Sequence, residues 1–369
     1  MLSTVSAALL VVLGLLLPAG MWASGVDLPI PEGVLPPEIP ADNPLTAEKV
    51  ALGRRLFFDK RLSRDDTVSC ATCHDPRHAF VDPRGTPTSA GVGGARGVRN
   101  APTVLDAAFL AAQFWDGRAE TLEAQAAQPI LNPVEMAMPD AASLAQKLRA
   151  LPGYPDLFRR AFGDRGIRLQ TVAQAIASFE RTLISLDAPI DRFLKGDRDA
   201  LSPAAQRVWK LFNGKARCNS CHGYVAALPV FTDDAYHNIG VAAKDVRFRE
   251  LARQVEHSPE SLARLSHEPG IHQLGRFLVS RKTRDLGAFK TPQLRNVART
   301  APYMHDGSEA TLADVIEFYD RGGNPNPWLD GGIRPLGLLP REKADLVALL
   351  ESFTSADLDR FEDLAPKHP

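Results

Sequence analysis

The sequence predicts an all-α protein made of two homologous domains, and three observations lead to this prediction. Apolar residues recur at helical spacing: Val172, Ile176, Phe179, Leu183 and Leu186 follow one another at intervals of four or three residues, which places them on one side of a helix. Alternating stretches long enough to form a β-strand are nearly absent. A set of short motifs occurs twice in the same order, once in each half of the chain.

The composition is that of an ordinary folded protein and excludes several classes. The chain has 369 residues, with 43 Lys and Arg against 44 Asp and Glu, so its formal net charge is −1. Hydrophobic residues make up 44% and charged residues 24%, which is typical of globular domains. We therefore expect no nucleic-acid binding, no basic membrane-surface segment and no acidic disordered tail. The length suits two domains, each with its own core.

The first 24 residues, 1–24, are predicted to be a secretory signal peptide. The apolar run over residues 7–17 is too short to cross a bilayer, and the small residues that signal peptidase accepts follow it. No later stretch is long and apolar enough to span a membrane. We expect an exported chain without a membrane span, divided into an N-terminal domain, residues 25–190, and a C-terminal domain, residues 191–369.

The internal repeat places the same motifs at corresponding points of the two halves. Each half contains Cys-x-x-Cys-His, then Arg-Asn, then Ala-Pro, then Asp-Gly-x-x-x-Thr-Leu. Because chance rarely produces such landmarks in one order, we expect two homologous domains with one cofactor each. The first copies lie at 70–74, 99–102 and 116–122, and the second copies at 218–222, 295–302 and 306–312.

Cys-x-x-Cys-His is the attachment motif of c-type haem. Its thiols bond the two vinyl groups, and its histidine becomes the proximal ligand of the iron. A zinc ribbon does not explain a histidine after each cysteine pair, and a thioredoxin-like redox pair would lie beside a βαβ pattern, which is missing. We therefore predict two covalent c-type haems, which use all four cysteines. The first is held by Cys70, Cys73 and His74, and the second by Cys218, Cys221 and His222.

The sixth coordination position decides between an electron carrier and an enzyme, and here the two halves differ. An ungapped alignment of the two Asp-Gly-x-x-x-Thr-Leu segments places Tyr319 opposite Pro129, each twelve residues after the glycine. A tyrosinate can ligate iron, whereas a proline cannot, so we expect an open first iron and a second iron ligated by Tyr319. Taken alone, Tyr319 is also explained as a packed core residue, and Met304 and His305 are rival ligands.

Six longer segments carry a more specific resemblance. They are Ser-Cys-Ala-Thr-Cys-His-Asp-Pro (69–76), Gln-Phe-Trp-Asp-Gly-Arg-Ala (113–119), Leu-Asn-Pro-Val-Glu-Met-Ala-Met-Pro-Asp (131–140), Tyr-His-Asn-Ile-Gly (236–240), Leu-Arg-Asn-Val-Ala (294–298) and Ala-Pro-Tyr-Met-His (301–305). In this order they resemble the bacterial di-haem cytochrome c peroxidase/MauG family. The resemblance implies two cytochrome-c-like domains in the periplasm, a peroxide-binding N-terminal haem, an electron-transfer C-terminal haem and a calcium ion between them.

Two positions in this resemblance indicate the MauG-like branch of the family. Ordinary peroxidases of the family carry Met where this chain has Tyr319, whereas the MauG-like branch carries Tyr. Ordinary peroxidases also carry a histidine, ahead of the Arg-Asn-Ala-Pro segment, that closes the first haem until the enzyme is reduced. Val92 stands at that position here, and valine cannot ligate iron. Both departures agree with the asymmetry between Tyr319 and Pro129.

The resemblance also implies roles for three residues near the first haem. Glu135 and Gln125 match the distal-pocket pair, where a carboxylate takes a proton from bound peroxide and returns it to the leaving oxygen. Trp115 matches the tryptophan between the haems. Without the resemblance, Glu135 would be interpreted as a solvated loop carboxylate and Trp115 as part of the core.

The implied calcium ion has three matching ligands. Asn100 through its side chain, and Thr300 and Pro302 through their carbonyl oxygens, match the family's site, and oxygen ligands suit a hard cation.

One position departs from MauG, because Ala216 replaces a tryptophan that relays oxidising equivalents to the protein substrate. The other histidines are interpreted as loop or structural residues: His78, His237, His257, His267 and His272.

The leading hypothesis is a periplasmic di-haem peroxidase. It would use hydrogen peroxide to form a high-valent di-haem state that oxidises a partner protein, at tryptophan or tyrosine. An alternative is a cytochrome c peroxidase that reduces hydrogen peroxide with electrons from a small cytochrome c or cupredoxin. A third hypothesis, from another class, is a non-enzymatic di-haem electron carrier.

Overall fold

The structure, a computed structural model, describes residues 25–242, 247–256 and 258–364. Within these ranges the chain is mostly helical, which confirms the predicted class apart from one small sheet. Its strands β1 (Tyr236–His237) and β2 (Phe289–Lys290) pair antiparallel. The expected signal peptide, residues 1–24, lies outside the described residues. In the described ranges, no helix has the length and apolar character needed to cross a membrane.

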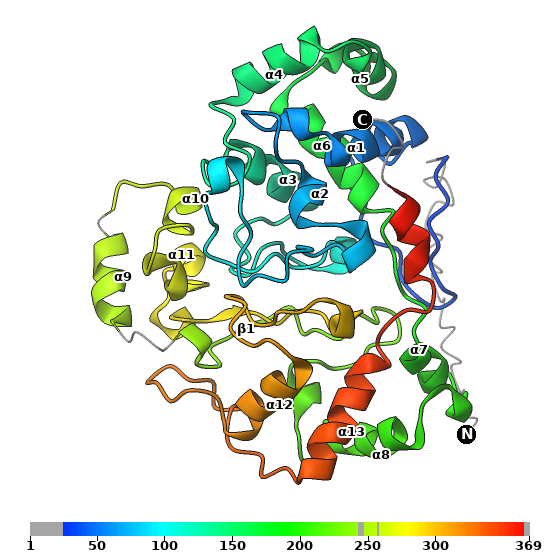
Figure 1. The fold of residues 1–369 in the computed structure, drawn as a ribbon, viewed down its shortest axis with the longest axis vertical. Helices are drawn as coiled ribbons and strands as arrows, with labels where there is room; N and C mark the ends of the chain where they lie inside the picture. Colours follow the sequence, from blue (N-terminus) through cyan, green and yellow to red (C-terminus); the bar gives the residue numbers. More distant parts are fainter. Residues whose placement is uncertain (1–24, 243–246, 257, 365–369) are drawn as a thin grey trace, which may run out of the picture.

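The helices fall into two sets along the chain. Figure 1 shows α1–α6 in one part of the molecule and α7, α8, α12 and α13 in the other, with α9–α11 beside the boundary between them. The first set is α1 (Ala47–Phe58), α2 (Cys70–Cys73), α3 (Leu122–Leu131), α4 (Ala141–Ala150), α5 (Tyr154–Phe162) and α6 (Leu169–Glu180). The second set is α7 (Pro189–Leu194), α8 (Pro203–Phe212), α9 (Phe248–Glu256), α10 (Leu262–Leu265), α11 (Phe277–Ser280), α12 (Leu312–Asp320) and α13 (Pro340–Glu351).

The core of the first part forms between α1, α3 and α6. A Cβ atom at Gly53 of α1 would lie 1.8 Å from the carbonyl oxygen of Ala175 in α6, so only glycine permits the close contact of these two helices. Fully buried aromatic rings continue this core, and Phe57 packs edge-on against Phe179 with ring centroids 5.4 Å apart. Each ring buried in this way contributes about 1.5–3 kcal/mol to the free energy of unfolding.

The helix predicted from the apolar stripe is shorter than the stripe. α6 ends at Glu180, although Leu183 and Leu186 beyond it are still buried. The cause is Asp106, whose backbone N–H donates to the carbonyl oxygen of Leu183 and whose carboxylate accepts from the N–H of Ser185. These bonds take up backbone groups that a longer helix would need.

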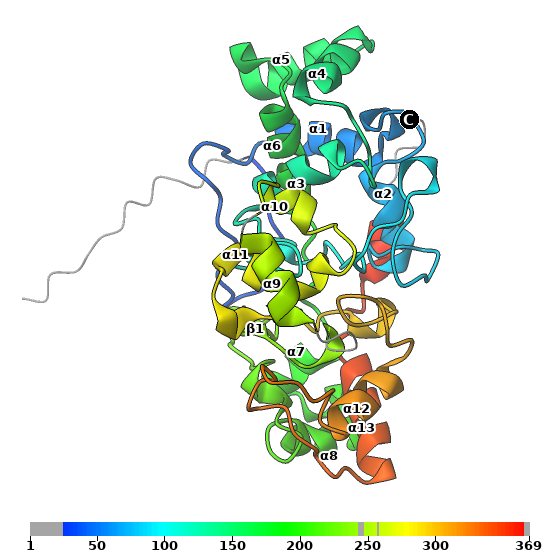
Figure 2. The same ribbon diagram turned by 90° about the vertical axis from the view of Figure 1, so that its left-hand side faces the viewer.

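The two parts of the molecule are interlocked through segments that cross between them. The 3₁₀-helix η12 (Leu358–Leu364) follows α13 and returns to the first part, where Phe361 packs against Phe80 with ring centroids 5.9 Å apart. In the other direction, α9–α11 lie at mid-height beside the first part in both views (Figures 1 and 2). Each half of the chain can therefore contribute residues to a site in the other half.

Candidate haem sites

The second Cys-x-x-Cys-His motif opens onto a cavity of about 290 Å³. Cys218, Cys221, His222 and Tyr319 all line this cavity, which we call the second-haem cavity. Nδ1 of His222 lies 3.0 Å from the carbonyl oxygen of Phe231, which fixes the ring and leaves Nε2 for a metal. Burial lowers the pKa of His222, so the ring is the neutral imidazole that ligation requires.

The first motif has the same local arrangement. Cys70 and Cys73 begin and end the single turn α2, and Nδ1 of His74 lies 3.1 Å from the carbonyl oxygen of Phe80. Burial lowers the pKa of His74 and raises the pKa of the Cys70 thiol. Two thiols on one turn beside a neutral, oriented imidazole fit covalent haem attachment.

The aligned helices of the repeat begin in the same way. Thr121 caps α3 and Thr311 caps α12, each with its side chain accepting from the backbone N–H three residues on. Pro129 and Tyr319 each lie eight residues after the capping threonine. Because α3 and α12 begin at corresponding residues, the structure supports the ungapped alignment that placed Pro129 and Tyr319 opposite each other.

The Asp-Gly turn of each half contacts the other half. Gly117 and Gly307 both have a positive φ, +67° and +69°, which favours glycine. A Cβ atom at Gly117 would lie 1.8 Å from the hydroxyl of Tyr236, and one at Gly307 would lie 2.5 Å from the backbone of Pro87. The repeated glycines are thus explained by two reciprocal contacts between the halves.

Two tyrosines line the second-haem cavity, and they differ in their partners. The hydroxyl of Tyr303 donates to the carbonyl oxygen of Val297 at 3.0 Å, which directs it to the protein backbone. Tyr319 lines the same cavity, and burial together with the nearby Cys221 and Cys218 thiols raises the pKa of its hydroxyl. A cation at the phenol oxygen would be needed to displace its proton near neutral pH.

The rival ligands Met304 and His305 also lie on the cavity wall. The His305 ring is stacked on Phe289 with centroids 3.6 Å apart, and its Nε2 lies 2.8 Å from Oε1 of Gln273. Burial lowers the pKa of His305 well below its usual range. These contacts give His305 a structural role in the wall and leave Tyr319 and Met304 as the candidate ligands.

Glu135 lies beside the first motif. Its charge is among the causes that raise the pKa of the Cys70 and Cys73 thiols. Burial raises the pKa of Glu135 itself, while the charge of Arg118 and a hydrogen bond from Asn132 oppose this rise. A carboxyl group with a raised pKa is suited to taking up and releasing a proton.

Gln125 and the loop of Glu135 meet at α3. Gln125 and Pro129 are four residues apart on this helix and share one face. The chain then folds back, and the backbone N–H of Met136 donates to the carbonyl oxygen of Pro129 at 3.2 Å. The structure therefore brings Pro129, one turn after Gln125 on α3, next to the loop that carries Glu135.

Trp115 lies at the junction of the halves. It belongs to the first half but lines the second-haem cavity, and its Nε1 donates to the carbonyl oxygen of Asn100 at 2.9 Å. Asn100, Thr300 and Pro302 line the same cavity. The side-chain amide nitrogen of Asn100 donates to the carbonyl oxygen of Pro87 at 3.2 Å, so its side-chain oxygen, the kind of atom that a calcium ion prefers, is the one left to act as the predicted ligand.

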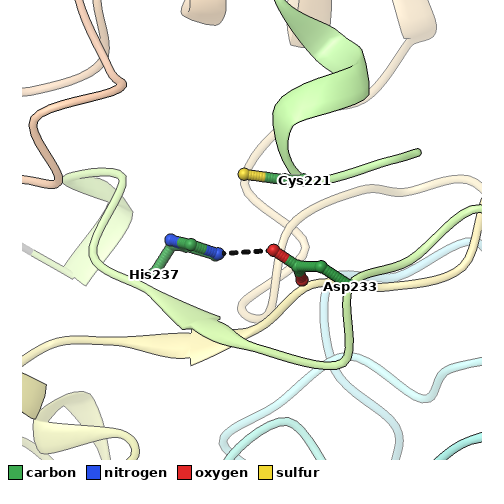
Figure 3. Close-up of side chains that lie close together, drawn as sticks. All are labelled: Cys221, Asp233 and His237. Carbon is green, nitrogen blue, oxygen red and sulfur yellow. Dashed lines mark hydrogen bonds and ion pairs between the residues drawn. The ribbon is translucent and has the colours of Figure 1, made fainter. Parts of the chain in front are cut away.

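His237 was interpreted as a structural histidine, but it lies against the second motif. The sulfur of Cys221, a carboxylate oxygen of Asp233 and a ring nitrogen of His237 lie within 4.8 Å of one another (Figure 3). Nε2 of His237 lies 2.9 Å from Asp233, and Nδ1 lies 2.7 Å from Asp330. With both ring nitrogens donating to carboxylates, His237 is an imidazolium and not a metal ligand.

Hydrogen bonds to Cys221 first, and then to Asp330 and Asp233, raise the pKa of His237 to about 10 against the effect of burial. If Cys221 were bonded to a haem vinyl group, the Asp330 and Asp233 carboxylates would remain as partners of the ring. His237 thus lies at the predicted attachment point of the second haem, where two carboxylates hold its ring. The sequence signal for His237 was the Tyr-His-Asn-Ile-Gly segment (236–240), in which this histidine lies.

His267 is the second residue that sequence reasoning missed. It follows α10 in the second half, yet its Nε2 lies 2.9 Å from Nδ2 of Asn132 in the first half. No motif singled it out, because its partner is brought to it only by the packing of α9–α11 against the first half.

A mostly helical chain with two covalent-attachment motifs, each beside a buried and oriented histidine, defines a di-haem protein of the c type. The model of the family "Di-haem cytochrome c peroxidase" matches residues 47–199. The chain is 42% identical to methylamine utilization protein MauG of Methylorubrum extorquens, over 85% of this chain and 80% of that protein. It is 35% identical to cytochrome-c peroxidase IdrP1 of a Pseudomonas species, over 91% and 88%.

A solved structure supports the same assignment. The crystal structure of a MauG-like protein associated with microbial copper homeostasis superposes with a TM-score of 0.76 and 33% identity, covering 90% of this chain and 97% of that one. The chain belongs to the di-haem cytochrome c peroxidase/MauG family. It is a peroxide-dependent oxidoreductase, and the family implies two c-type haems.

Proposed function

We propose that the protein is a periplasmic, MauG-like di-haem peroxidase that uses hydrogen peroxide to oxidise tryptophan or tyrosine of a partner protein. The observation that carries this choice is Tyr319, which lines the second-haem cavity at the repeat position where the first half has Pro129. We assign the peroxide-binding haem to residues 25–190 and the electron-transfer haem to residues 191–369.

At the first haem site, peroxide is converted with the help of residues that accept and donate its protons. When bound, the haems would supply redox-active iron. His74 would hold the first iron, and His222 and Tyr319 would hold the second. Glu135 takes a proton from one oxygen of peroxide and returns it to the other, and Gln125 orients the bound molecule. Overall, peroxide gains two electrons and two protons and becomes two waters, while the partner loses two electrons and two protons.

Electrons reach the first haem through the junction of the halves. Trp115 is placed for this path because it lines the second-haem cavity from the first half and is held by Asn100. A calcium ion held by Asn100, Thr300 and Pro302 would fix the same junction. Loss of that ion should therefore slow transfer between the two haem sites more than it slows peroxide binding.

The surface that meets the partner is proposed to involve Trp209 or Tyr224. Trp209 stacks on Phe212, with ring centroids 5.5 Å apart, and Phe212 lines the second-haem cavity. Tyr224 packs on Phe231 at 5.4 Å, just after the second motif. Either ring could take over the relay at the site where Ala216 replaces tryptophan.

A second candidate function is a scavenging cytochrome c peroxidase, favoured by the identity to IdrP1. To separate the two, the holoprotein is given peroxide with a co-expressed neighbouring protein, or with a reduced small cytochrome c as the donor. Peroxide-dependent covalent modification of the neighbour, seen by mass spectrometry, supports the MauG-like function. Rapid cytochrome oxidation without any protein modification would instead establish the scavenging function.

A further inference from the structure

A histidine from the second half contacts two side chains of the first half beside the proposed peroxide site. Nε2 of His267 lies 2.9 Å from Nδ2 of Asn132 and 3.4 Å from an Nη atom of Arg118. Both Asn132 and Arg118 belong to the first half, in the segments that flank α3. The segment after α10 thus places one imidazole on these two side chains.

The two contacts fix the protonation of this histidine. An amide nitrogen and a guanidinium only donate, so Nε2 must accept from both and Nδ1 carries the proton. Nδ1 is buried and has no hydrogen-bond partner among the described residues. Burial and the charges of Arg118 and Arg99, opposed by Asp116, lower the pKa of His267 to about 4. The imidazole is therefore neutral at the pH values at which the enzyme would work.

The same two side chains act on Glu135. The backbone N–H of Glu135 donates to the carbonyl oxygen of Asn132 at 3.1 Å. The charge of Arg118 and a hydrogen bond from the Asn132 side chain also lower the pKa of Glu135, against the effect of burial. Arg118 is held from its other side by Asp116 at 3.0 Å and by Gln128 at 3.1 Å. His267 supplies the acceptor on the remaining side, and it does so from a different part of the chain.

We propose that His267 is a positioning residue of the peroxide site, which holds Asn132 and Arg118 against Glu135 and so keeps that carboxylate ready to accept a proton from peroxide. The proposal rests on the proposed function of Glu135 at the first haem. It means that the second half completes the proton-handling site of the first half, and that the packing of α9–α11 is coupled to peroxide chemistry.

The test compares two isosteric changes in the holoenzyme. In His267→Gln the amide reaches the position of Nε2 and keeps an acceptor there, whereas in His267→Asn the amide reaches only the position of Nδ1. His272→Gln is the matched control, because His272 lies in the same segment but its Nδ1 meets the carbonyl oxygen of Glu268. Stopped-flow absorbance follows the reaction with peroxide between pH 4 and 9.

We expect His267→Asn to react about tenfold more slowly near neutral pH, as is common when a residue that orients a catalytic group is lost. The acidic limb of its pH–rate profile should move to higher pH, because a loosened Arg118 and Asn132 stabilise the Glu135 carboxylate less. The C–O stretching frequency of the ferrous carbonyl adduct should shift as well. His267→Gln and His272→Gln should match the parent within about threefold, with an unshifted limb.

Several outcomes would overturn the proposal. An unshifted pH limb and carbonyl frequency in His267→Asn would remove His267 from the site, even if the rate fell. An equal loss in His267→Gln and His267→Asn would leave only a packing role. If the parent holoenzyme does not react with peroxide at the first haem, the proposed function is wrong. The positioning role is tested separately, because a carbonyl frequency that is unchanged in His267→Asn would reject it.

Discussion

The backbone N–H of Val92 donates to the carbonyl oxygen of Glu135 at 2.8 Å. This bond ties the loop that in ordinary family peroxidases carries a closing histidine to the loop that carries the proposed acid–base residue. Val92 is itself buried and offers no ligand atom. Val92 is apolar and is held at the position of the closing histidine by its own backbone. We therefore expect an open first haem in the resting protein.

Gly91 permits this contact, which leads to the first prediction. A Cβ atom there would lie 2.3 Å from the carbonyl oxygen of Val134 and 2.4 Å from that of Glu135. Gly91→Ala should therefore push the two loops apart and lower the free energy of unfolding by about 1–3 kcal/mol. Thermal unfolding measures this loss, and Gly97→Ala is the control because its nearest neighbour would lie 3.7 Å away. Equal stability of both variants would contradict the role of Gly91.

The second prediction concerns haem attachment. Cys70→Ala with Cys73→Ala should leave one covalent haem, and Cys218→Ala with Cys221→Ala should leave the other. Intact mass and pyridine-haemochrome absorbance of the denatured protein count the haems in each case. Two haems retained after either double change would refute the assignment of the motifs.

How well these sites could be predicted from the sequence depends on how far apart in the sequence the interacting residues are. The attachment motifs and the Tyr319–Pro129 asymmetry were predictable, because they rest on residues adjacent in sequence or on a repeat with equal offsets. Thr121 and Thr311 preserve those offsets in the structure by capping their helices at the same point. The end of α6 was not predictable, because Asp106, distant in sequence, binds the backbone beyond Glu180.

The contact of His267 with Asn132 could not be predicted from the sequence either. Neither residue lies in a repeated motif, and the contact exists only because α9–α11 fold back onto the first half. A periodic pattern reports which face of an element is buried, but it does not report which distant segment covers that face. Histidines interpreted one by one as structural therefore included His237, which the structure places against Cys221 of the second motif, and His267, which it places against Asn132 of the first half.

The third prediction concerns the second iron. The resting ferric protein should show one high-spin and one low-spin haem by electron paramagnetic resonance, without prior reduction. An anionic oxygen ligand stabilises oxidised iron, so Tyr319→Met should raise the potential of the second haem. Tyr303→Phe is the control, because its hydroxyl is engaged with the backbone of Val297. Two low-spin haems in the resting protein would contradict an open first iron. An unchanged potential in Tyr319→Met would count against Tyr319 as a ligand.

The fourth prediction follows from the raised pKa of Glu135. The carboxylate form accepts the proton of peroxide, so the rate should fall as the pH drops through a pKa above the ordinary value of about 4.3. Glu135→Gln should lower the rate about 10²–10⁴-fold and abolish this acidic limb. Stopped-flow absorbance across pH 4–9 measures both effects. A parent-like rate and limb in Glu135→Gln would exclude it from the mechanism.

The last prediction concerns the path between the halves. Trp115→Phe removes the indole N–H that donates to Asn100 and shortens the aromatic bridge at the second-haem cavity. Transfer of electrons to the first haem should then slow, whereas peroxide binding should not, because Glu135 and Gln125 are unchanged. We therefore expect oxidation of the partner protein to fall about tenfold or more while the rate of the first reaction with peroxide stays within threefold. Trp328→Phe is the matched control, since Trp328 packs on Phe248 and is not among the residues that line the second-haem cavity. Partner oxidation that survives in Trp115→Phe but is lost in Trp328→Phe would place the electron path elsewhere.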